Sequence, residues 1–278
     1  MKAPKGLPSA IPTDRTVVLG VLNVTPDSFS DGGRFLQIDA AIAHGLDLVQ
    51  PGADIVDIGG ESTRPGSTPI DPAVELERVL PVVRGLVAEG VAVSIDTMHA
   101  TTARSAVEQG ACLINDVSGG RFDAAMYPTV AELGVPFVLM HWRGRDVRHH
   151  THYDDPVGEV RAEFLQAVEH AVDAGVDPAA IVMDPGLGFA KDGETNWVLL
   201  RERMAVAAGY PMLVGASRKR FLGELLGPSD QRPIADRDVA THVISALIDD
   251  VWGIRVHDVR GTRDALAVAQ AMKGNDHG

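Results

Sequence analysis

The feature that most constrains the fold of this chain is a pattern repeated eight times: a short apolar run that ends in polar residues. The runs are nearly continuous in Val, Ile and Leu, which is typical of parallel strands buried on both faces. Helical patterns lie between them, and eight strand–helix units are what a closed parallel barrel requires. The runs span residues 17–23, 54–62, 91–96, 112–116, 136–141, 180–184, 211–217 and 253–257.

The pattern predicts an α/β fold, a single-domain (β/α)8 TIM barrel. The chain has 278 residues, close to the roughly 250 typical of one such barrel. We expect an N-terminal tail over residues 1–15, the barrel over 16–273 and a C-terminal tail over 274–278. The structural alternative is a doubly wound open sheet, which would gather functional residues near one switch point. The barrel is favoured because polar clusters end all eight runs.

Several helix starts can be read from capping residues. Asp71-Pro72 and Asp155-Pro156 each combine an N-cap residue with a proline at the first helical position. Asp39 precedes a third helical pattern that continues through Ile42 and Leu46. These positions predict helices that connect successive strands.

Composition excludes several classes of function. The formal net charge is −13, whereas nucleic-acid binding favours a basic surface. No apolar run approaches the roughly 20 residues of a membrane span, and the N-terminus lacks the apolar core of a signal peptide. Cys112 is the only cysteine, so no internal disulfide can form; this favours the cytoplasm, with Cys112 as a core thiol. We expect no nucleic-acid partner and no membrane association.

Three polar residues end the third, fourth and sixth runs: Asp96, Asn115 and Asp184. On a barrel their side chains can converge over the C-terminal mouth, where TIM barrels carry their active sites. Two carboxylates and an amide suit a ligand edge with several N–H donors and a carbonyl. A divalent metal site is the other interpretation, because magnesium and manganese prefer oxygen ligands.

Cationic residues follow the seventh and eighth runs. The segment 215–220 reads GASRKR, and Arg255 and His257 point the same way along an extended strand. Loops after strands seven and eight often bind phosphate in this fold. A second glycine-rich segment, GLGFAK at 186–191, is not a Walker loop and by itself indicates only a tight turn.

Two long polar loops follow the first and second runs. Residues 23–33 are rich in oxygen donors and end in two glycines, and residues 61–67 contain Thr63, Arg64 and Pro65. Loops of this kind at the active face can close over a substrate. A His-rich stretch contains His149, His150 and His152, but no familiar zinc-ligand frame surrounds it, so we interpret it as a solvated loop.

Seven sequence strings resemble the successive signatures of one family, dihydropteroate synthase. They are LGVLNVTPDSFSDGG, DIGGESTRPG, SIDT, NDVSGG, MDPGLGF, GASRKRFLG and RVHDV, in the family order from Leu19 to Val259. The sequences of these strings, together with HWR after the fifth run, are most similar to those of actinobacterial members. The resemblance therefore covers nearly the whole chain.

The resemblance implies a reaction and its partners. Dihydropterin pyrophosphate would condense with p-aminobenzoate to give 7,8-dihydropteroate and pyrophosphate, in folate biosynthesis. It also implies dependence on Mg²⁺, a TIM barrel and a homodimer. Because no strong general base is apparent and pyrophosphate-handling groups are abundant, we expect a dissociative displacement, with magnesium assisting the departure of pyrophosphate. Because the segment 61–67 shows no obvious insertion, sensitivity to sulfonamides is expected.

The resemblance also implies roles for individual residues. The pterin-binding residues would be Asp96, Asn115, Asp184, Lys219 and Arg255, and the metal-binding residue Asn23. The pyrophosphate would be bound by Arg64, Arg255 and His257, and p-aminobenzoate by Phe29, Thr63, Pro65 and Ser217, with Arg218 nearby. The catalytic set would comprise Asn23, Asp96, Lys219, Arg255 and His257.

Three other functions stay open. One is a non-catalytic pterin-binding paralogue, against which the intact Asn23, Asp96, Lys219, Arg255 and His257 argue. Another is a methyltetrahydrofolate methyltransferase, which would have no use for the STRPG and SRK segments. A generic magnesium-dependent lyase is the third.

Overall fold

Eight parallel strands form one sheet that closes on itself. The computed structural model describes residues 2–25, 34–61, 70–144, 152–227 and 232–274. The strand order is β6-β5-β4-β3-β2-β1-β8-β7. A parallel bridge between Met183 and Met212 joins the two ends of this series, with Met183 N–H donating to Pro211 O at 2.8 Å. The strands are β1 (Val17–Asn23), β2 (Ile55–Gly59), β3 (Val93–Asp96), β4 (Leu113–Asp116), β5 (Phe137–Met140), β6 (Ile181–Asp184), β7 (Leu213–Val214) and β8 (Gly253–Val256).

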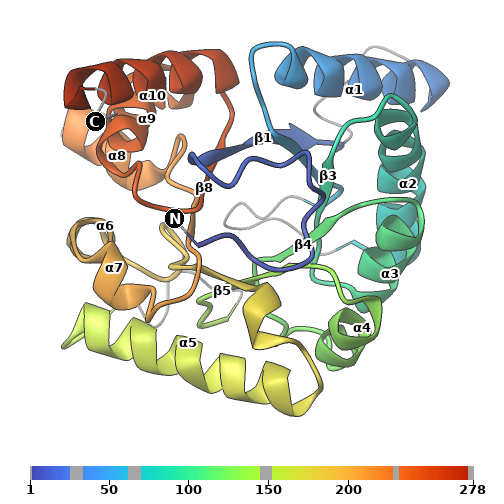
Figure 1. Cartoon of the computed structure of the whole chain (residues 1–278), viewed down its shortest axis with the longest axis horizontal. Helices are drawn as coiled ribbons and strands as arrows, with labels where there is room; N and C mark the ends of the chain where they lie inside the picture. Colours follow the sequence, from blue (N-terminus) through green and yellow to red (C-terminus); the bar gives the residue numbers. More distant parts are fainter. Residues whose placement is uncertain (1, 26–33, 62–69, 145–151, 228–231, 275–278) are drawn as a thin grey trace.

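Helices surround this sheet as an outer ring (Figure 1). The TIM barrel predicted from the sequence is therefore confirmed, and the open sheet is wrong. The helices are α1 (Arg34–Val49), α2 (Pro72–Ala88), α3 (Ala100–Glu108), α4 (Met126–Leu133), α5 (Pro156–Asp173), α6 (Gly193–Arg201), α7 (Arg203–Val206), α8 (Arg220–Leu226), α9 (Asp238–Leu247) and α10 (Val259–Lys273).

Two of the three predicted helix starts are confirmed. The Asp71 carboxylate accepts from Ala73 N–H at the start of α2, and the Asp155 carboxylate accepts from Gly158 N–H at the start of α5. The start predicted at Asp39 is wrong, because α1 begins at Arg34 and Asp39 lies inside it. The intervening residues tolerate a helical conformation, so the apolar pattern alone could not locate its first turn.

The interior of the barrel is apolar at its N-terminal end. There the strands contribute a layer of buried side chains: Val17, Leu19, Ile55, Leu113, Val138, Val182 and Leu213, with Trp252. Ile11 packs into this layer, and Ala3 and Leu7 lie against it. In Figure 1 the N-terminal segment crosses the barrel opening. The segment predicted as a tail therefore covers this end of the barrel.

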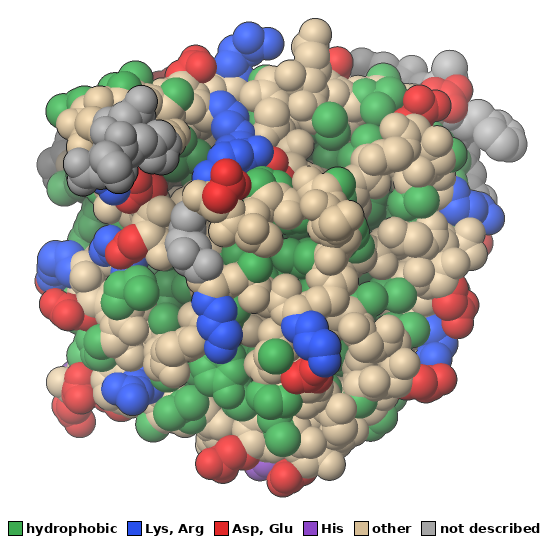
Figure 2. Space-filling model, viewed as in Figure 1, with side chains coloured by type: hydrophobic (Ala, Val, Ile, Leu, Met, Phe, Trp, Pro, Cys, Tyr) green, Lys and Arg blue, Asp and Glu red, His purple; other side chains and the backbone are tan. Residues whose placement is uncertain are grey.

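The single cysteine, Cys112, lies half-buried immediately before β4. Burial raises the pKa of its thiol, which makes it a poor nucleophile. On the face seen in Figure 2, Lys and Arg side chains are scattered among Asp and Glu. None of the helices in the described ranges combines the length and apolarity needed to cross a membrane.

Candidate active site at the C-terminal mouth of the barrel

The inward face of the strands changes from apolar to polar within two residues. Side chains two apart along a strand point to the same face, so Ile55 is followed by Asp57 inside the barrel. In the same way Leu113 is followed by Asn115, and Val182 by Asp184. A polar layer therefore lies above the apolar one, at the C-terminal mouth. This is where the sequence predicted that Asp96, Asn115 and Asp184 would converge.

Arg255 joins this polar layer from β8. Its Nε donates to Asp57 Oδ2 at 2.5 Å, and its Nη2 donates to Asp96 Oδ2 at 2.7 Å. Asn115 Nδ2 donates to the same Asp57 oxygen at 3.1 Å. Four strands thus meet through one hydrogen-bonded cluster of Asp57, Asp96, Asn115 and Arg255. The prediction that side chains from distant segments meet at one mouth is confirmed for Asp96, Asn115 and Arg255, and the structure adds Asp57 to them.

The electrostatics of the cluster follow from burial. Burial raises the pKa of Asp96 to about 7, and Arg255 opposes this rise. Burial lowers the pKa of Arg255, but Asp57 and Asp96 more than offset it, so the guanidinium stays charged. Burial also raises the pKa of Asp184, although the Gly186 N–H and Lys219 stabilise its anion. The floor of the mouth therefore contains carboxyl groups that burial makes easier to protonate, with the charged Arg255 fixed among them.

Lys219 also lies at the mouth, near Asp184. Its Nζ donates to Leu187 O at 2.8 Å and lies 4.2 Å from the centroid of the Phe189 ring. Asp184 Oδ1 accepts from Gly186 N–H at 2.7 Å. Burial lowers the pKa of Lys219 to about 8, against the attraction of Asp184. The turn after β6 therefore orients both charged groups.

Ser217 and His257 form a second polar pair at the mouth. Ser217 Oγ lies 2.9 Å from His257 Nδ1 and accepts from His257 N–H at 3.2 Å. Since the backbone N–H occupies an acceptor position on the hydroxyl, the hydroxyl proton can point at Nδ1, which leaves Nε2 as the protonated ring nitrogen. Burial, with Arg255 nearby, lowers the pKa of His257 to about 3, so the imidazole is neutral.

Asn23 ends β1 opposite a glycine. In the β1–β2 register Asn23 faces Gly59, and in the β2–β3 register Gly59 faces Asp96. A Cβ added at Gly59 would lie 3.7 Å from Asn23 Oδ1 and 3.6 Å from Asp96 Oδ2. The bare glycine thus keeps space beside Asn23 Oδ1, whereas Asp96 Oδ2 is already bonded to Arg255. One amide oxygen fits Mg²⁺, which usually takes one or two protein oxygens and completes its shell with water and phosphate.

The structure corrects the interpretation of the 215–220 segment as three cations facing a phosphate. The Arg218 guanidinium is held by Asp238, with Nε–Oδ1 at 2.8 Å and Nη2–Oδ2 at 2.7 Å. The exposed Arg220 pairs with Glu224 on α8. Only Lys219 of the three reaches Leu187 and Phe189 at the mouth. The ion-pairing partner of Arg218 lies 20 residues downstream, and spacing gave no signal for it.

Several of the predicted residues lie in segments that the structure does not describe. Phe29, Thr63, Arg64 and Pro65 lie outside the described residues, as do His149 and His150. His152 is described: it is exposed and lies 3.1 Å from Asp154. Its surroundings are those of a solvated loop residue.

Sequence reasoning missed two buried carboxylates. Asp57 is fully buried and accepts hydrogen bonds from both Arg255 and Asn115. The sequence feature that could have revealed it is an acidic residue in the middle of the apolar run IVDIG. Glu75, on α2, accepts from Thr97 at 2.8 Å and from Thr102 at 2.7 Å. The amphipathic pattern of α2 gave no sign that this residue faces the barrel.

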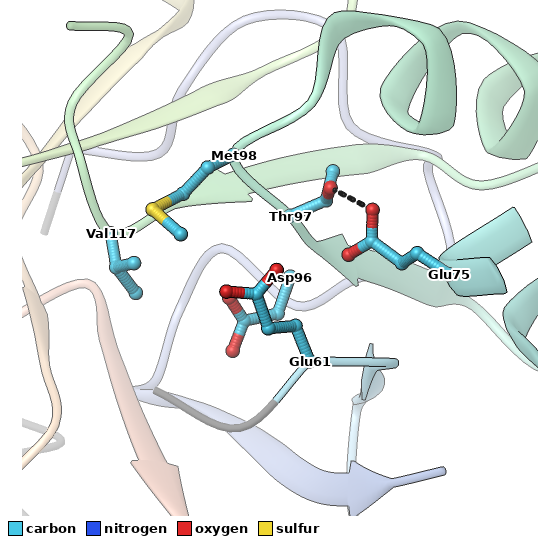
Figure 3. Close-up of a pocket in the computed structure, with 6 residues that line it drawn as sticks. All are labelled: Glu61, Glu75, Asp96, Thr97, Met98 and Val117. Carbon is cyan, nitrogen blue, oxygen red and sulfur yellow. Dashed lines mark hydrogen bonds between the residues drawn. The ribbon is translucent and has the colours of Figure 1, made fainter. Parts of the chain in front are cut away.

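A small cavity adjoins Asp96. It has a volume of about 10 Å³ and is lined by Glu61, Glu75, Asp96, Thr97, Met98 and Val117 (Figure 3). That volume is near the minimum for one water molecule. Burial raises the pKa of Glu75, and its hydrogen bonds to Thr102 and Thr97 oppose the rise. The hydrogen bond from Thr97 to Glu75 fixes the side chain of Thr97, the residue that follows Asp96.

Comparison with known proteins shows the family to which a chain of this sequence and fold belongs. The family described as "Pterin binding enzyme" matches residues 19–257, a range that includes the C-terminal end of every strand. The chain belongs to the pterin-binding enzyme family. The dihydropteroate synthase of Mycobacterium leprae is 57% identical over 262 residues, which cover 91% of this chain and 92% of that protein. The synthase of Bacillus subtilis is 40% identical over 276 residues, covering 97% and 94%.

Solved structures of family members share the architecture. A Xanthomonas albilineans dihydropteroate synthase with 4-aminobenzoic acid has a TM-score of 0.87 and 43% identity, with 94% of each chain covered. A structure of the enzyme from the same organism in complex with 7,8-dihydropteroate has a TM-score of 0.84 and 40% identity, covering 94% and 95%. The resemblance to dihydropteroate synthase, and to its actinobacterial members, is therefore confirmed.

Proposed function

We propose that the C-terminal mouth of this barrel joins dihydropterin pyrophosphate to p-aminobenzoate, giving 7,8-dihydropteroate and pyrophosphate. The observation that carries the proposal is the cluster of Asp96, Asn115, Asp184, Lys219 and Arg255 in one mouth. Its supports are the family membership and the relatives whose structures hold 4-aminobenzoate or dihydropteroate. The chain is thus a transferase of the folate pathway.

The acidic floor suits the pterin ring. The carboxylates of Asp96 and Asp184 can accept from its amino and ring N–H groups, while Asn115 and Lys219 can donate to ring nitrogen and carbonyl oxygen. Arg255 is held along the edge of its guanidinium plane by Asp57 and Asp96. Its planar face can therefore stack on the ring.

The pyrophosphate would lie toward Arg255 and His257. The neutral imidazole of His257 can donate from Nε2, because Ser217 occupies Nδ1. Asn23 would hold Mg²⁺ beside the pyrophosphate oxygens. Bound there, the ion would supply positive charge that stabilises the leaving group. Arg64 would add a further cation.

The displacement we propose is dissociative. An aryl amine is a modest nucleophile, so the demanding step is the departure of a highly charged leaving group. Asp96 and Asp184 lie at the floor of the mouth, where they can stabilise positive charge that spreads over the pterin ring. The C–O bond to pyrophosphate breaks first, the amine nitrogen then forms a bond to the CH₂ carbon, and the aryl ammonium that results gives its proton to water. Phe29, Thr63, Pro65 and Ser217 would bind p-aminobenzoate.

The proposal is tested by mixing purified protein with dihydropterin pyrophosphate, p-aminobenzoate and magnesium. We expect dihydropteroate and pyrophosphate in equal amounts, and inhibition by a sulfonamide that competes with p-aminobenzoate. A protein that binds the pterin but releases no pyrophosphate would instead be a non-catalytic paralogue. Methyl transfer to a corrinoid without pyrophosphate release would support the methyltransferase alternative.

The order of bond breaking has its own test. Positional isotope exchange in dihydropterin pyrophosphate, without p-aminobenzoate, should scramble the bridging oxygen if the C–O bond breaks first. Absence of scrambling, together with a strong dependence of the rate on amine nucleophilicity, would contradict the dissociative step.

We also propose that the chain forms a homodimer through α9 and α10. These helices pack on each other, and α9 exposes Val239, Val243 and Leu247 at four-residue spacing. On α10, Val268 and Met272 are exposed at the same spacing. Apolar stripes of this kind mark interfaces between proteins. Light scattering should give twice the chain mass, and Leu247→Glu should shift it toward the monomer; a monomeric wild type would reject the proposal.

The compartment we propose is the cytoplasm. A chain with one cysteine can form no internal disulfide, which fits a reducing compartment. Cell fractionation with an antibody to the protein would test this assignment, and recovery outside the cytoplasm would contradict it.

A further inference from the structure

Lys191 is a buried lysine that the proposed reaction does not use. It follows the glycine-rich turn after β6 and is almost completely buried. Its Nζ has three hydrogen-bond partners: His141 Nδ1 at 2.9 Å, Gly186 O at 3.1 Å and Phe189 O at 3.0 Å. An ammonium has three N–H donors, so each donor has one acceptor. Burial lowers the pKa of Lys191 to about 7, and the negative charges of Asp184 and Glu163 oppose this fall.

The partner of Lys191 is itself fixed. His141, directly after β5, lies with its Nε2 2.9 Å from Glu163 Oε2 on α5. Burial, with Lys191 beside it, lowers the pKa of His141, so the ring is neutral. Hydrogen bonds from His141 and Arg143 outweigh burial and lower the pKa of Glu163, which keeps it ionised. Nε2–H therefore donates to Glu163, and Nδ1 is the acceptor for Lys191.

The turn that Lys191 holds is the one that orients Lys219. Lys191 binds the carbonyls of Gly186 and Phe189, at the two ends of this turn. Between them Leu187 O accepts from Lys219, and the Phe189 ring lies under the Lys219 ammonium. The turn approaches the backbone of His141 so closely that a Cβ added at Gly186 would clash with His141 O, and only glycine fits at this position.

We propose that Lys191 is a positioning residue for pterin binding: it holds the Gly186–Phe189 turn and thereby places the Lys219 ammonium at the mouth. His141 and Glu163 orient Lys191, so the effect extends from α5 through β5 to the substrate. This inference rests on the proposed function of Lys219. Lys191 itself touches no substrate in this scheme, because its three donors are occupied by protein acceptors.

The test compares Lys191→Met with Lys219→Met and the double variant. Methionine keeps the length of the side chain and removes the donors. The equilibrium Kd for dihydropterin pyrophosphate is measured by calorimetry, and steady-state assays give the KM for p-aminobenzoate. We expect Lys191→Met to raise the pterin Kd about tenfold, the weight of roughly one hydrogen bond from a charged group, and to change the KM for p-aminobenzoate less than about twofold.

The double variant separates positioning from a general loss of structure. If Lys191 acts through Lys219, then Lys191→Met should raise the pterin Kd less than about twofold in the Lys219→Met background, because coupled residues are non-additive. The matched control is Lys5→Met, which removes an exposed lysine paired with Asp177 and should leave the pterin Kd unchanged. An equal effect of Lys191→Met in both backgrounds, or no effect in the wild-type background, overturns the proposal.

A folding defect in Lys191→Met does not end the test. Glu163→Gln keeps the shape of the side chain that accepts from His141 but weakens this hydrogen bond, because the charge is lost. The variant should therefore raise the pterin Kd about threefold in the wild-type background and cause no further rise in the Lys219→Met background. Absence of that pattern also overturns the proposal. Because Kd is measured without turnover, a wild type that binds the pterin but forms no dihydropteroate refutes the proposed reaction alone.

Discussion

Two layers of the barrel interior, one above the other on the same strands, have opposite chemistry. The lower layer contains Ile55, Leu113 and Val182, all fully buried and apolar. Two residues further along the same strands, the upper layer contains Asp57, Asn115 and Asp184. Only about 6–7 Å of strand separates the two layers. The barrel therefore divides its interior into a part that stabilises the fold and a part that binds the substrate.

This division predicts different consequences for substitutions in the two layers. An apolar side chain in the lower layer contributes through packing and burial, which act on the free energy of unfolding. A charged side chain in the upper layer costs free energy when buried, and this cost is offset by partners such as Arg255. Changes in the lower layer should alter stability alone, whereas changes in the upper layer should alter pterin binding, with an added cost in stability where a buried ion pair is broken.

The largest effect is expected for Arg255→Ala. Removal of the guanidinium leaves Asp57 and Asp96 buried without their cation, at a cost of about 3–5 kcal/mol. The same variant loses the group that would contact both ring and pyrophosphate. We expect kcat/KM for dihydropterin pyrophosphate to fall at least a hundredfold, roughly 3 kcal/mol in transition-state stabilisation, in a steady-state assay.

Arg218→Ala is the matched control, because its guanidinium is held by Asp238, near the mouth. A partly exposed ion pair contributes about 0–1 kcal/mol, so kcat/KM should change by less than about fivefold. Similar small effects of the two arginine variants would contradict the assignment of Arg255 to the centre of the site.

In the lower layer, Leu113→Ala should destabilise the fold without changing the site. Truncation of a buried leucine costs about 2–5 kcal/mol in the free energy of unfolding. Urea denaturation followed by circular dichroism measures this cost, and calorimetry measures the Kd for the pterin substrate. We expect the Kd to stay within about twofold. A large rise in Kd with unchanged stability would show that the two layers are not separable.

The sequence predicted much of this arrangement because a parallel strand carries its own pattern. Buried β-strands give continuous apolar runs, and a polar residue at the end of such a run marks the mouth of a barrel. Asp96, Asn115 and Asp184 were found in this way. Asp57 was missed because it lies inside its run, where only the fully closed barrel shows that it meets Arg255.

Residues whose roles depend on partners distant in the chain could not be predicted. The pairing of Arg218 with Asp238 depends on how the loop after β7 folds back against α9. Glu75 meets Thr97 only because α2 packs beside β3. Similarly, the 186–191 segment reads as a simple tight turn, although Lys191 joins it to His141. Such contacts depend on tertiary packing, which a single sequence does not encode by spacing alone.

A smaller effect than that of Leu113→Ala is expected for Asp184→Asn in the upper layer. The amide keeps the size of the side chain but removes the negative charge that would accept from the pterin. Loss of one charge-assisted hydrogen bond costs about 1.5–3 kcal/mol, so the pterin Kd should rise about tenfold to a hundredfold. The melting temperature should change little. An unchanged Kd would place the pterin elsewhere in the mouth.

The smallest effect is expected from pH, through Lys219. Burial lowers the pKa of this lysine to about 8, so the cation is present below that pH and is lost as the pH rises through it. Since kcat/KM reports the free enzyme, it should fall about tenfold from its plateau below pH 8 to its value at pH 9. Lys219→Arg should remove this alkaline decline, because arginine stays charged, even if its rate is lower throughout. The same decline in Lys219→Arg would assign it to another group or to the substrate, and would contradict a role for the Lys219 charge in the upper layer.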